Sequence, residues 1–102
     1  MDDKLIIENL EREWDFDTGF FGLLRQGKFD AAGLNRLVDT LSVISFLDHE
    51  LINRRAVSLL WYIPLFMRWQ RERVEKNGGD VAELEKATNR VQALVETILG
   101  VP

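Results

Sequence analysis

Cysteine is absent from the 102 residues, and histidine occurs once, as His49. Without cysteine the chain has no disulfide framework, no thiolate nucleophile and no zinc site that uses sulfur ligands. With one histidine, a transition-metal site would have to rely on carboxylates alone. We therefore expect no metal and no other cofactor, and a reducing, cytoplasmic environment.

Long hydrophobic runs are absent too. The longest stretch without a charge, residues 56–67, includes Ser58, Tyr62 and Pro64. It is shorter than the ~20 residues needed to span a bilayer, so we expect no membrane-spanning helix. The first residues are acidic, whereas a signal peptide starts with basic residues and an apolar stretch, so we expect no secretion by that route.

No segment alternates between apolar and polar residues in the manner of a β-strand, and apolar residues recur at helical spacing instead. A chain of this length has room for one hydrophobic core of normal size. The sequence therefore predicts one all-α domain over residues 1–102, a compact bundle of four main helices.

The first predicted helix extends from about Asp3 to Gln26 and has a weak middle. Residues 15–19, Asp-Phe-Asp-Thr-Gly, combine side chains that prefer helix caps with a glycine that weakens a helix interior. We expect a break or restart there. Gly27 is well placed to end this helix, because glycine accepts the left-handed conformation found after many helices.

The second predicted helix begins after a cap at Asp30 and ends near Leu47. Its apolar residues have the spacing of a bundle seam: Leu34, Leu37, Leu41 and Ile44. The fourth begins at Asp80, which forms an acidic variant of the capping box with Glu83. Its apolar residues are Leu84, Ala87, Val91, Leu94 and Ile98, and Gly100 and Pro102 close it.

The third predicted helix begins after a cap at Asp48 and extends to about Lys76, where Asn77-Gly78-Gly79 forms a strong stop. Pro64 lies inside it. Since proline lacks an amide hydrogen and clashes with the preceding turn, we expect a bend just before this residue.

This third helix is apolar on two faces. A core-facing stripe comprises Ile52, Ala56, Leu59, Leu60, Ile63, Phe66, Met67 and Val74, and a second stripe comprises Leu51, Trp61, Tyr62, Leu65 and Trp69. Such a helix is either sandwiched inside its own domain or offers one face to another molecule. Because tryptophan, tyrosine and arginine dominate binding hot spots, Trp61, Tyr62, Leu65 and Trp69 are candidate partner-binding residues.

Charge is unevenly distributed about the net value of −4. Residues 1–17 hold seven acids and two bases, whereas residues 50–76 hold six bases and three acids. Either the two segments are neighbours that partly neutralise each other, or the acidic segment docks a basic partner. The second interpretation makes Glu8, Glu11, Glu13 and Asp15 candidate partner-binding residues.

Three stretches imitate catalytic signatures. Residues 22–29 have the spacing of a phosphate-binding loop, but Phe29 stands where a hydroxyl must bind magnesium. Asp17-Thr18-Gly19 is the triplet of aspartic proteases, and Asp15-Phe16-Asp17 resembles the paired aspartates of haloacid-dehalogenase-like phosphatases. Both enzyme classes need strands, whereas the flanks here are helical. Helix capping explains both aspartates, so we expect no enzyme.

Nucleic-acid binding is a further alternative, because arginines and an aromatic ring occur together at Arg68, Trp69, Arg71 and Arg73. The overall acidity argues against it, since nucleic-acid-binding domains usually carry a clear positive excess.

Residues 13–21 and 24–30, Glu-Trp-Asp-Phe-Asp-Thr-Gly-Phe-Phe and Leu-Arg-Gln-Gly-Lys-Phe-Asp, resemble segments of small helical immunity proteins from bacterial polymorphic toxin systems. The resemblance covers less than a third of the chain. It implies a cytoplasmic inhibitor that binds and neutralises a cognate toxin domain. The alternatives are a homodimeric structural or adaptor protein and a transcription-related regulator. The aromatic residues of this part, Trp14, Phe16, Phe20, Phe21 and Phe29, are interpreted as core packing.

Overall fold

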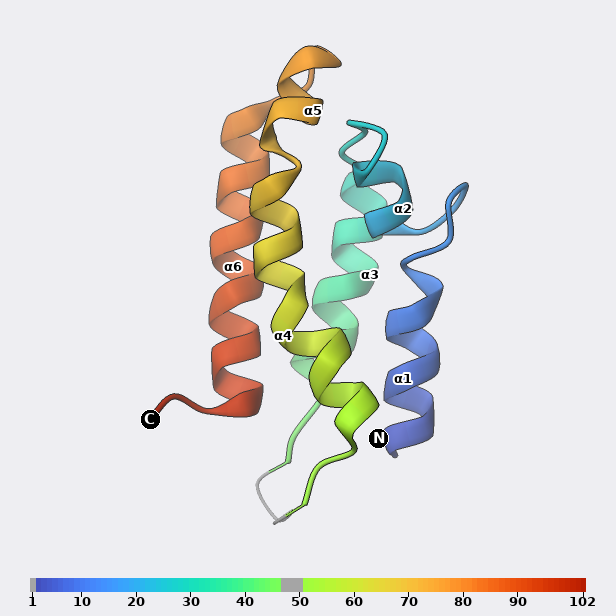
Figure 1. Cartoon of the computed structure of the whole chain (residues 1–102), viewed down its shortest axis with the longest axis vertical. Coiled ribbons are helices and arrows are strands. Elements are labelled where there is room, and N and C mark those ends of the chain that lie inside the picture. The colour runs from blue at the N-terminus through green and yellow to red at the C-terminus, as the bar shows by residue number, and fades with distance from the viewer. Residues whose placement is uncertain (1, 47–50) are drawn as a thin grey trace.

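A computed structural model describes residues 2–46 and 51–102. These residues form six helices, α1 (Asp3–Arg12), α2 (Phe20–Leu24), α3 (Ala31–Ser42), α4 (Arg54–Trp69), α5 (Arg71–Lys76) and α6 (Val81–Leu99), and they contain no strand (Figure 1). The predicted all-helical class is confirmed. The helices outnumber the four that were predicted, because the first and the third predicted helix are each divided in two.

The longer helices pack around one hydrophobic core. Helix α4 packs against both α6 and α1, and α3 packs against the same two helices (Figure 1). Buried apolar residues from all six helices join a single cluster. The molecule measures 44 × 28 × 19 Å, and its smallest dimension accommodates about two layers of helices. Every long helix therefore keeps one face toward the outside.

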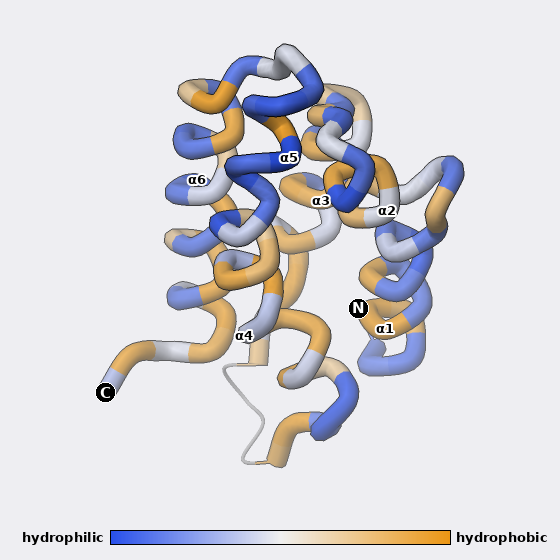
Figure 2. The backbone as a smooth tube through the Cα atoms, turned by 45° about the horizontal axis from the view of Figure 1, so that its top comes forward, coloured by the Kyte–Doolittle hydropathy of each residue, from blue (hydrophilic) through white to orange (hydrophobic). Residues whose placement is uncertain are grey.

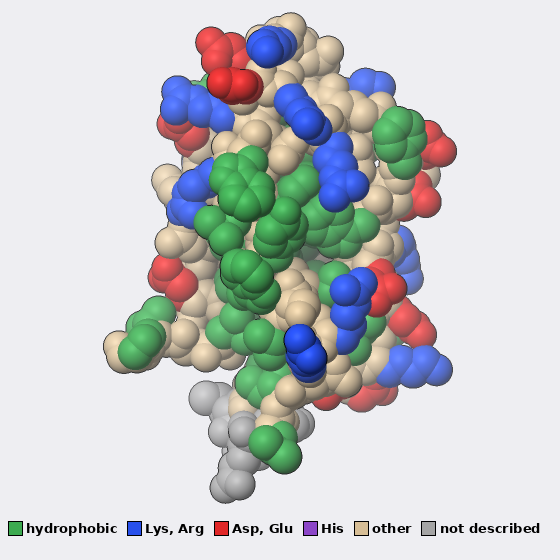
Figure 3. Space-filling view, viewed as in Figure 1, with side chains coloured by type: hydrophobic (Ala, Val, Ile, Leu, Met, Phe, Trp, Pro, Cys, Tyr) green, Lys and Arg blue, Asp and Glu red, His purple; other side chains and the backbone are tan. Residues whose placement is uncertain are grey.

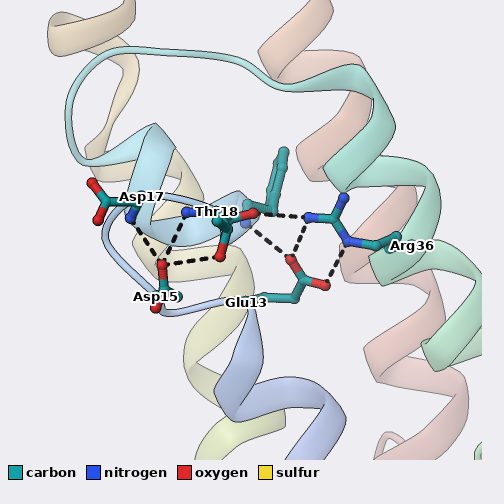
Figure 4. Close-up of polar contacts among 6 residues, drawn as sticks. Glu13, Asp15, Asp17, Thr18 and Arg36 are labelled. Carbon is teal, nitrogen blue, oxygen red and sulfur yellow. Dashed lines mark hydrogen bonds and ion pairs between the residues drawn. The ribbon is translucent and has the colours of Figure 1, made fainter.

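A tight turn separates α1 from α2. One carboxylate oxygen of Asp15 accepts hydrogen bonds from the backbone N–H groups of Asp17 and Thr18 and from the Thr18 hydroxyl, at 2.9 to 3.0 Å (Figure 4). Helix α2 begins after Gly19 without a side-chain cap. The break predicted at residues 15–19 is confirmed, but the interpretation of the aspartates as helix caps is wrong, because Asp15 stabilises the turn itself.

Helix α4 begins and ends within the predicted third helix. Asn53 caps its start by accepting hydrogen bonds from the N–H groups of Arg55 and Ala56. The predicted cap, Asp48, lies outside the described residues. The helix continues through Pro64, and the bend expected there stays a prediction. At the other end, buried Gln70 separates α4 from α5.

The remaining helix ends agree with the sequence in part. Helix α3 ends at Ser42, earlier than predicted, although Ile44 beyond it is still buried, and Leu47 lies outside the described residues. Asp80 accepts a hydrogen bond from the Glu83 N–H at 3.1 Å, as the capping pattern predicts. Gly27, which follows α2, has a φ of 76° and provides the predicted stop.

Helix α5 ties the turn after α2 to the rest of the molecule. It is hydrophilic along most of its length, and only Val74 is buried (Figure 2). Arg73 donates a hydrogen bond from Nη1 to the carbonyl oxygen of Arg25 at 3.0 Å, and Asn77 donates one from Nδ2 to the carbonyl oxygen of Gly27 at 3.1 Å. The position of Arg25 is thus fixed by a segment that lies far along the chain.

The predicted core aromatics divide into three groups. Phe20 and Phe21 are fully buried, whereas Trp14 and Phe29 are half-buried against the core. Phe16 is 65% exposed, so its assignment to the core is wrong. Phe16 lies in the turn that Asp15 closes, and its two neighbours in the chain, Asp15 and Asp17, are exposed as well.

None of the helices in the described ranges is long and apolar enough to cross a membrane.

Candidate protein-binding surface

Four side chains of α4 form what we call the aromatic face: Trp61, Tyr62, Leu65 and Trp69. Trp61 is 52% exposed and Trp69 is 61% exposed, while Tyr62 and Leu65 are half-buried. Figure 3 shows a continuous apolar patch over this helix with Lys and Arg side chains along its edges. The interpretation that α4 is sandwiched within its own domain is therefore wrong, because the second stripe reaches the surface.

The exposed rings of the aromatic face are held by contacts with one another and with the core. The ring of Tyr62 meets those of Trp61 and Trp69 edge to face, each with centroids 5.8 Å apart. It also lies 6.3 Å from Trp14, whose ring is 4.7 Å from that of buried Phe66. Ordered rings lose little conformational freedom when a partner covers them, which favours binding.

A groove of about 350 Å³ lies beside the aromatic face. Its walls come from α1, α4 and the segments on either side of α2, and its lining residues are Glu11, Trp14, Arg25, Arg55, Ser58, Leu59 and Tyr62. The guanidinium carbon of Arg25 lies 5.0 Å from the centroid of the Trp14 ring and 5.5 Å from that of Phe66. Tyr62 belongs to both features, so the groove continues the aromatic face.

The surroundings of this surface are basic. Helix α4 contains Arg54, Arg55 and Arg68 and no acid, in a chain with a net charge of −4. Of these, Arg55 pairs with Glu11 at 3.2 Å, and both side chains are about half exposed. An ion pair so open to water contributes little to stability. Within residues 2–46 and 51–102, Arg54 and Arg68 form no ion pair.

The four candidate acids of the first segment do not share one surface. Glu13 is only 4% exposed, and its carboxylate accepts two hydrogen bonds from Arg36 and one from the Phe20 N–H (Figure 4). The hydrogen bonds to Glu13 raise the pKa of Arg36. Glu13 is therefore a structural residue and is not available to a partner, contrary to the sequence interpretation.

The other three acids differ in their contacts. Glu8 is exposed, and Glu11 lies in the groove beside Arg55. Asp15 is exposed, but hydrogen bonds from the Thr18 hydroxyl, the Thr18 N–H and the Asp17 N–H lower its pKa. The pairing of Glu11 with Arg55 shows that the acidic and basic segments are neighbours, as the first of the two charge interpretations predicts.

Five groove residues were missed from the sequence as binding residues, namely Trp14, Arg25, Arg55, Ser58 and Leu59. The two that form the stacked pair, Trp14 and Arg25, matter most. Trp14 was assigned to the core, and Arg25 was not considered at all. Neither has a local signal, because the groove exists only where residues 11, 25 and 55 converge from separate parts of the chain. The sequence offered one hint that Arg25 is free to bind a ligand, because residues 20–29 contain no acid that could pair with it.

Comparisons with protein families, with characterised proteins and with solved structures gave no match. The resemblance carried by residues 13–30 therefore stays a prediction. Several residues of that segment have a structural role within the fold. Glu13 and Asp15 hold local structure, and a Cβ on Gly22 would collide with the Asp15 carbonyl oxygen.

Proposed function

We propose that this chain is a non-catalytic protein-binding module that holds its partner against the aromatic face of α4. The observation that carries the proposal is the pair of ordered tryptophans, Trp61 and Trp69, each more than half exposed on one helix face. Lone exposed apolar residues are common, but a patch of tryptophan, tyrosine and arginine has the composition of an interface centre.

The proposal extends to the scaffold and to the kind of partner. The longer helices α1, α3, α4 and α6 would act as a four-helix bundle that presents the aromatic face on a rigid support. The partner we propose is a toxin domain that the chain neutralises by covering it. The small size of the chain and the resemblance of residues 13–30 to immunity proteins support this choice.

The first test is whether a gene next to the one for this chain encodes a toxin domain, and the second is a binding measurement between the chain and that domain. A neighbouring gene of another kind would contradict the toxin partner. Calorimetry on the purified pair should show that Trp61→Ser combined with Trp69→Ser weakens binding by about a hundredfold or more, since hot-spot tryptophans each contribute several kcal/mol. Val43→Ser is the matched control, because Val43 is also an exposed apolar residue but lies at the end of α3. Unchanged affinity in the double variant would exclude the aromatic face.

A homodimer is the second candidate, and the same observation favours it. A helix face with two exposed tryptophans is suited to a symmetric interface, in which each copy covers the other's patch. Light scattering at micromolar concentration tests this directly. A strict monomer contradicts the homodimer and leaves the binding-module proposal intact.

A further inference from the structure

We infer that the groove beside the aromatic face is a carboxylate-binding subsite, and that the partner segment filling it is an acidic peptide whose Asp or Glu stands next to apolar residues. The inference rests on the proposed function, since the groove and the aromatic face share Tyr62. It adds the chemistry of the partner, which exposure of the tryptophans alone does not give.

Arg25 is the residue that carries this inference. Its guanidinium lies over the ring of Trp14 and near that of Phe66, which is the arrangement of a cation–π contact. In the part of the chain that the structure describes, this guanidinium forms no ion pair and donates no hydrogen bond. Stacking occupies a face of the planar group, so its N–H donors remain available at the edge.

The cation of Arg25 is also held in place before any ligand arrives. The backbone carbonyl oxygen of Arg25 accepts the hydrogen bond from Arg73, and the rings of Trp14 and Phe66 contact its other end. An arginine presented in this way loses little rotational freedom on binding. Its fork of donors fits a carboxylate with two parallel hydrogen bonds.

The remaining lining of the groove suits an acidic side chain with apolar neighbours. Arg55 uses its Nε to reach Glu11 and adds a second cation to the groove lining. Leu59, Tyr62 and Trp14 supply apolar surface. A volume of about 350 Å³ lies at the lower end of the range for binding pockets, so it accommodates a few side chains.

Charge complementarity favours a negatively charged peptide in the groove. Three arginines border the aromatic face and the groove, namely Arg25, Arg55 and Arg68, whereas the groove contains a single acid, Glu11. The whole chain is acidic. An acidic peptide is therefore attracted to this surface. The same overall acidity disfavours nucleic acid, which prefers a domain with a positive excess.

The experiment is a selection from a library of random short peptides displayed on phage, with the full chain immobilised. We expect enrichment of sequences in which Asp or Glu lies next to Leu, Ile, Phe or Trp. A synthetic peptide of the enriched sequence is then titrated by calorimetry. Arg25→Gln should weaken its binding by about tenfold or more, the usual loss at a charge-paired anchor. Arg25→Lys should give an intermediate loss, because it keeps the charge but not the fork of donors.

Arg90→Gln is the matched control. Arg90 is exposed on α6, forms no ion pair in the described residues and does not line the groove. It removes the same charge and should leave peptide affinity nearly unchanged. Circular dichroism on each variant verifies that the helices are intact.

Several outcomes overturn the inference. Enrichment of basic or uncharged peptides does so, as does an acidic peptide that binds Arg25→Gln as well as the parent chain. Single-stranded oligothymidylate that binds more tightly than the acidic peptide, and loses this binding in Arg25→Gln, assigns the site to nucleic acid instead.

Two further outcomes separate this inference from the proposed function. If Trp61→Ser with Trp69→Ser abolishes peptide binding while Arg25→Gln does not, the proposed function stands and only the carboxylate subsite fails. If neither change matters, the aromatic face itself is wrong.

Discussion

Glu13 and Arg36 meet through two parallel hydrogen bonds, from Nε at 3.1 Å and from Nη2 at 3.0 Å, with the Glu13 carboxylate buried and Arg36 partly exposed (Figure 4). The same carboxylate accepts the N–H of Phe20 at 3.0 Å, at the first residue of α2. This pair joins the end of α1 to α2 and α3. It turns an acid of the N-terminal segment into a structural residue.

Glu13→Ala should therefore lower the free energy of unfolding by about 2 kcal/mol, because it removes the acceptor of the Phe20 N–H, while the partly exposed Arg36 can be hydrated. Arg36 loses both hydrogen bonds to Glu13 but keeps the one to the Thr18 carbonyl oxygen. Urea denaturation followed by circular dichroism measures the loss. Glu8→Ala is the control at an exposed acid, and it should change stability by less than about 0.5 kcal/mol. Equal effects of the two substitutions would contradict the role assigned to Glu13.

The turn at Asp15 should make stability depend on pH. Its hydrogen bonds from Thr18 and Asp17 lower the pKa of Asp15 in the folded chain below the unfolded value of about 3.9. A group with a depressed folded pKa contributes stability above the unfolded pKa and loses it as pH falls through the folded pKa. The stability difference between the parent chain and Asp15→Asn should thus be present at neutral pH and shrink in acid. Carbon-detected NMR titration of Asp15 gives the pKa directly, and an unshifted value would contradict this account.

Gly22→Ala should destabilise the chain although alanine is the better helix former. Propensity alone predicts a gain of about 1 kcal/mol within α2. The added Cβ would collide with the backbone carbonyl of Asp15, so we expect a net loss of about 2 kcal/mol. Gly78→Ala is a control without a steric collision, because no atom lies within 4 Å of that Cβ. Its expected cost is about 1 kcal/mol, from its positive φ of 75°. An increase in the stability of Gly22→Ala would show that the turn at Asp15 shifts to accommodate the added Cβ.

Fluorescence quenching should distinguish the three tryptophans. Trp61 and Trp69 are exposed beside arginines, whereas Trp14 is half-buried under Arg25. Iodide should quench the parent chain more strongly than caesium, because an anion concentrates near positive charge. Trp61→Phe with Trp69→Phe should remove most of the iodide effect. Strong iodide quenching that remains in this variant would show that the exposed tryptophan is Trp14.

Glu11→Gln separates an acidic peptide bound in the groove from a basic partner docked on the acidic segment. If the groove receives an acidic peptide, loss of Glu11 frees Arg55 and removes a repelling charge, so association should become faster, most clearly at low salt. If the acidic segment docks a basic partner, the same change should slow association. Stopped-flow measurement of the association rate over a range of salt concentrations decides between them, and Glu83→Gln on α6 serves as the control.

The helical class and most helix boundaries followed from the sequence because apolar spacing and capping residues act locally. The division at Gln70 did not, since no glycine or proline marks it. Periodicity identified both apolar faces of α4 but gave no means to decide which one a neighbouring helix covers. That depends on how the helices pack in three dimensions, and among the described residues the face with Trp61 and Trp69 is covered only in part.

The groove was beyond prediction for a related reason. Trp14 precedes the turn and α2 in the chain, and Arg25 follows α2. Tyr62 comes from α4, which is far from both in the sequence. Of the groove residues, only Glu11 and Tyr62 were named as binding residues from the sequence. Glu13 was misplaced because an acid that will be buried in an ion pair looks the same in sequence as one on the surface.

Two hydrogen bonds, one from Arg73 in α5 and one from Asn77 just after it, reach the turn after α2 and join residues 48 and 50 positions apart in the chain. Contacts between such distant positions exist only where the two parts of the chain are docked against each other. The hydrogen bond that holds the Arg25 backbone is therefore missing from a chain whose C-terminal half is not docked. A partner that recognises the groove recognises a finished molecule, and binding discriminates against partly folded chains without any separate quality-control device.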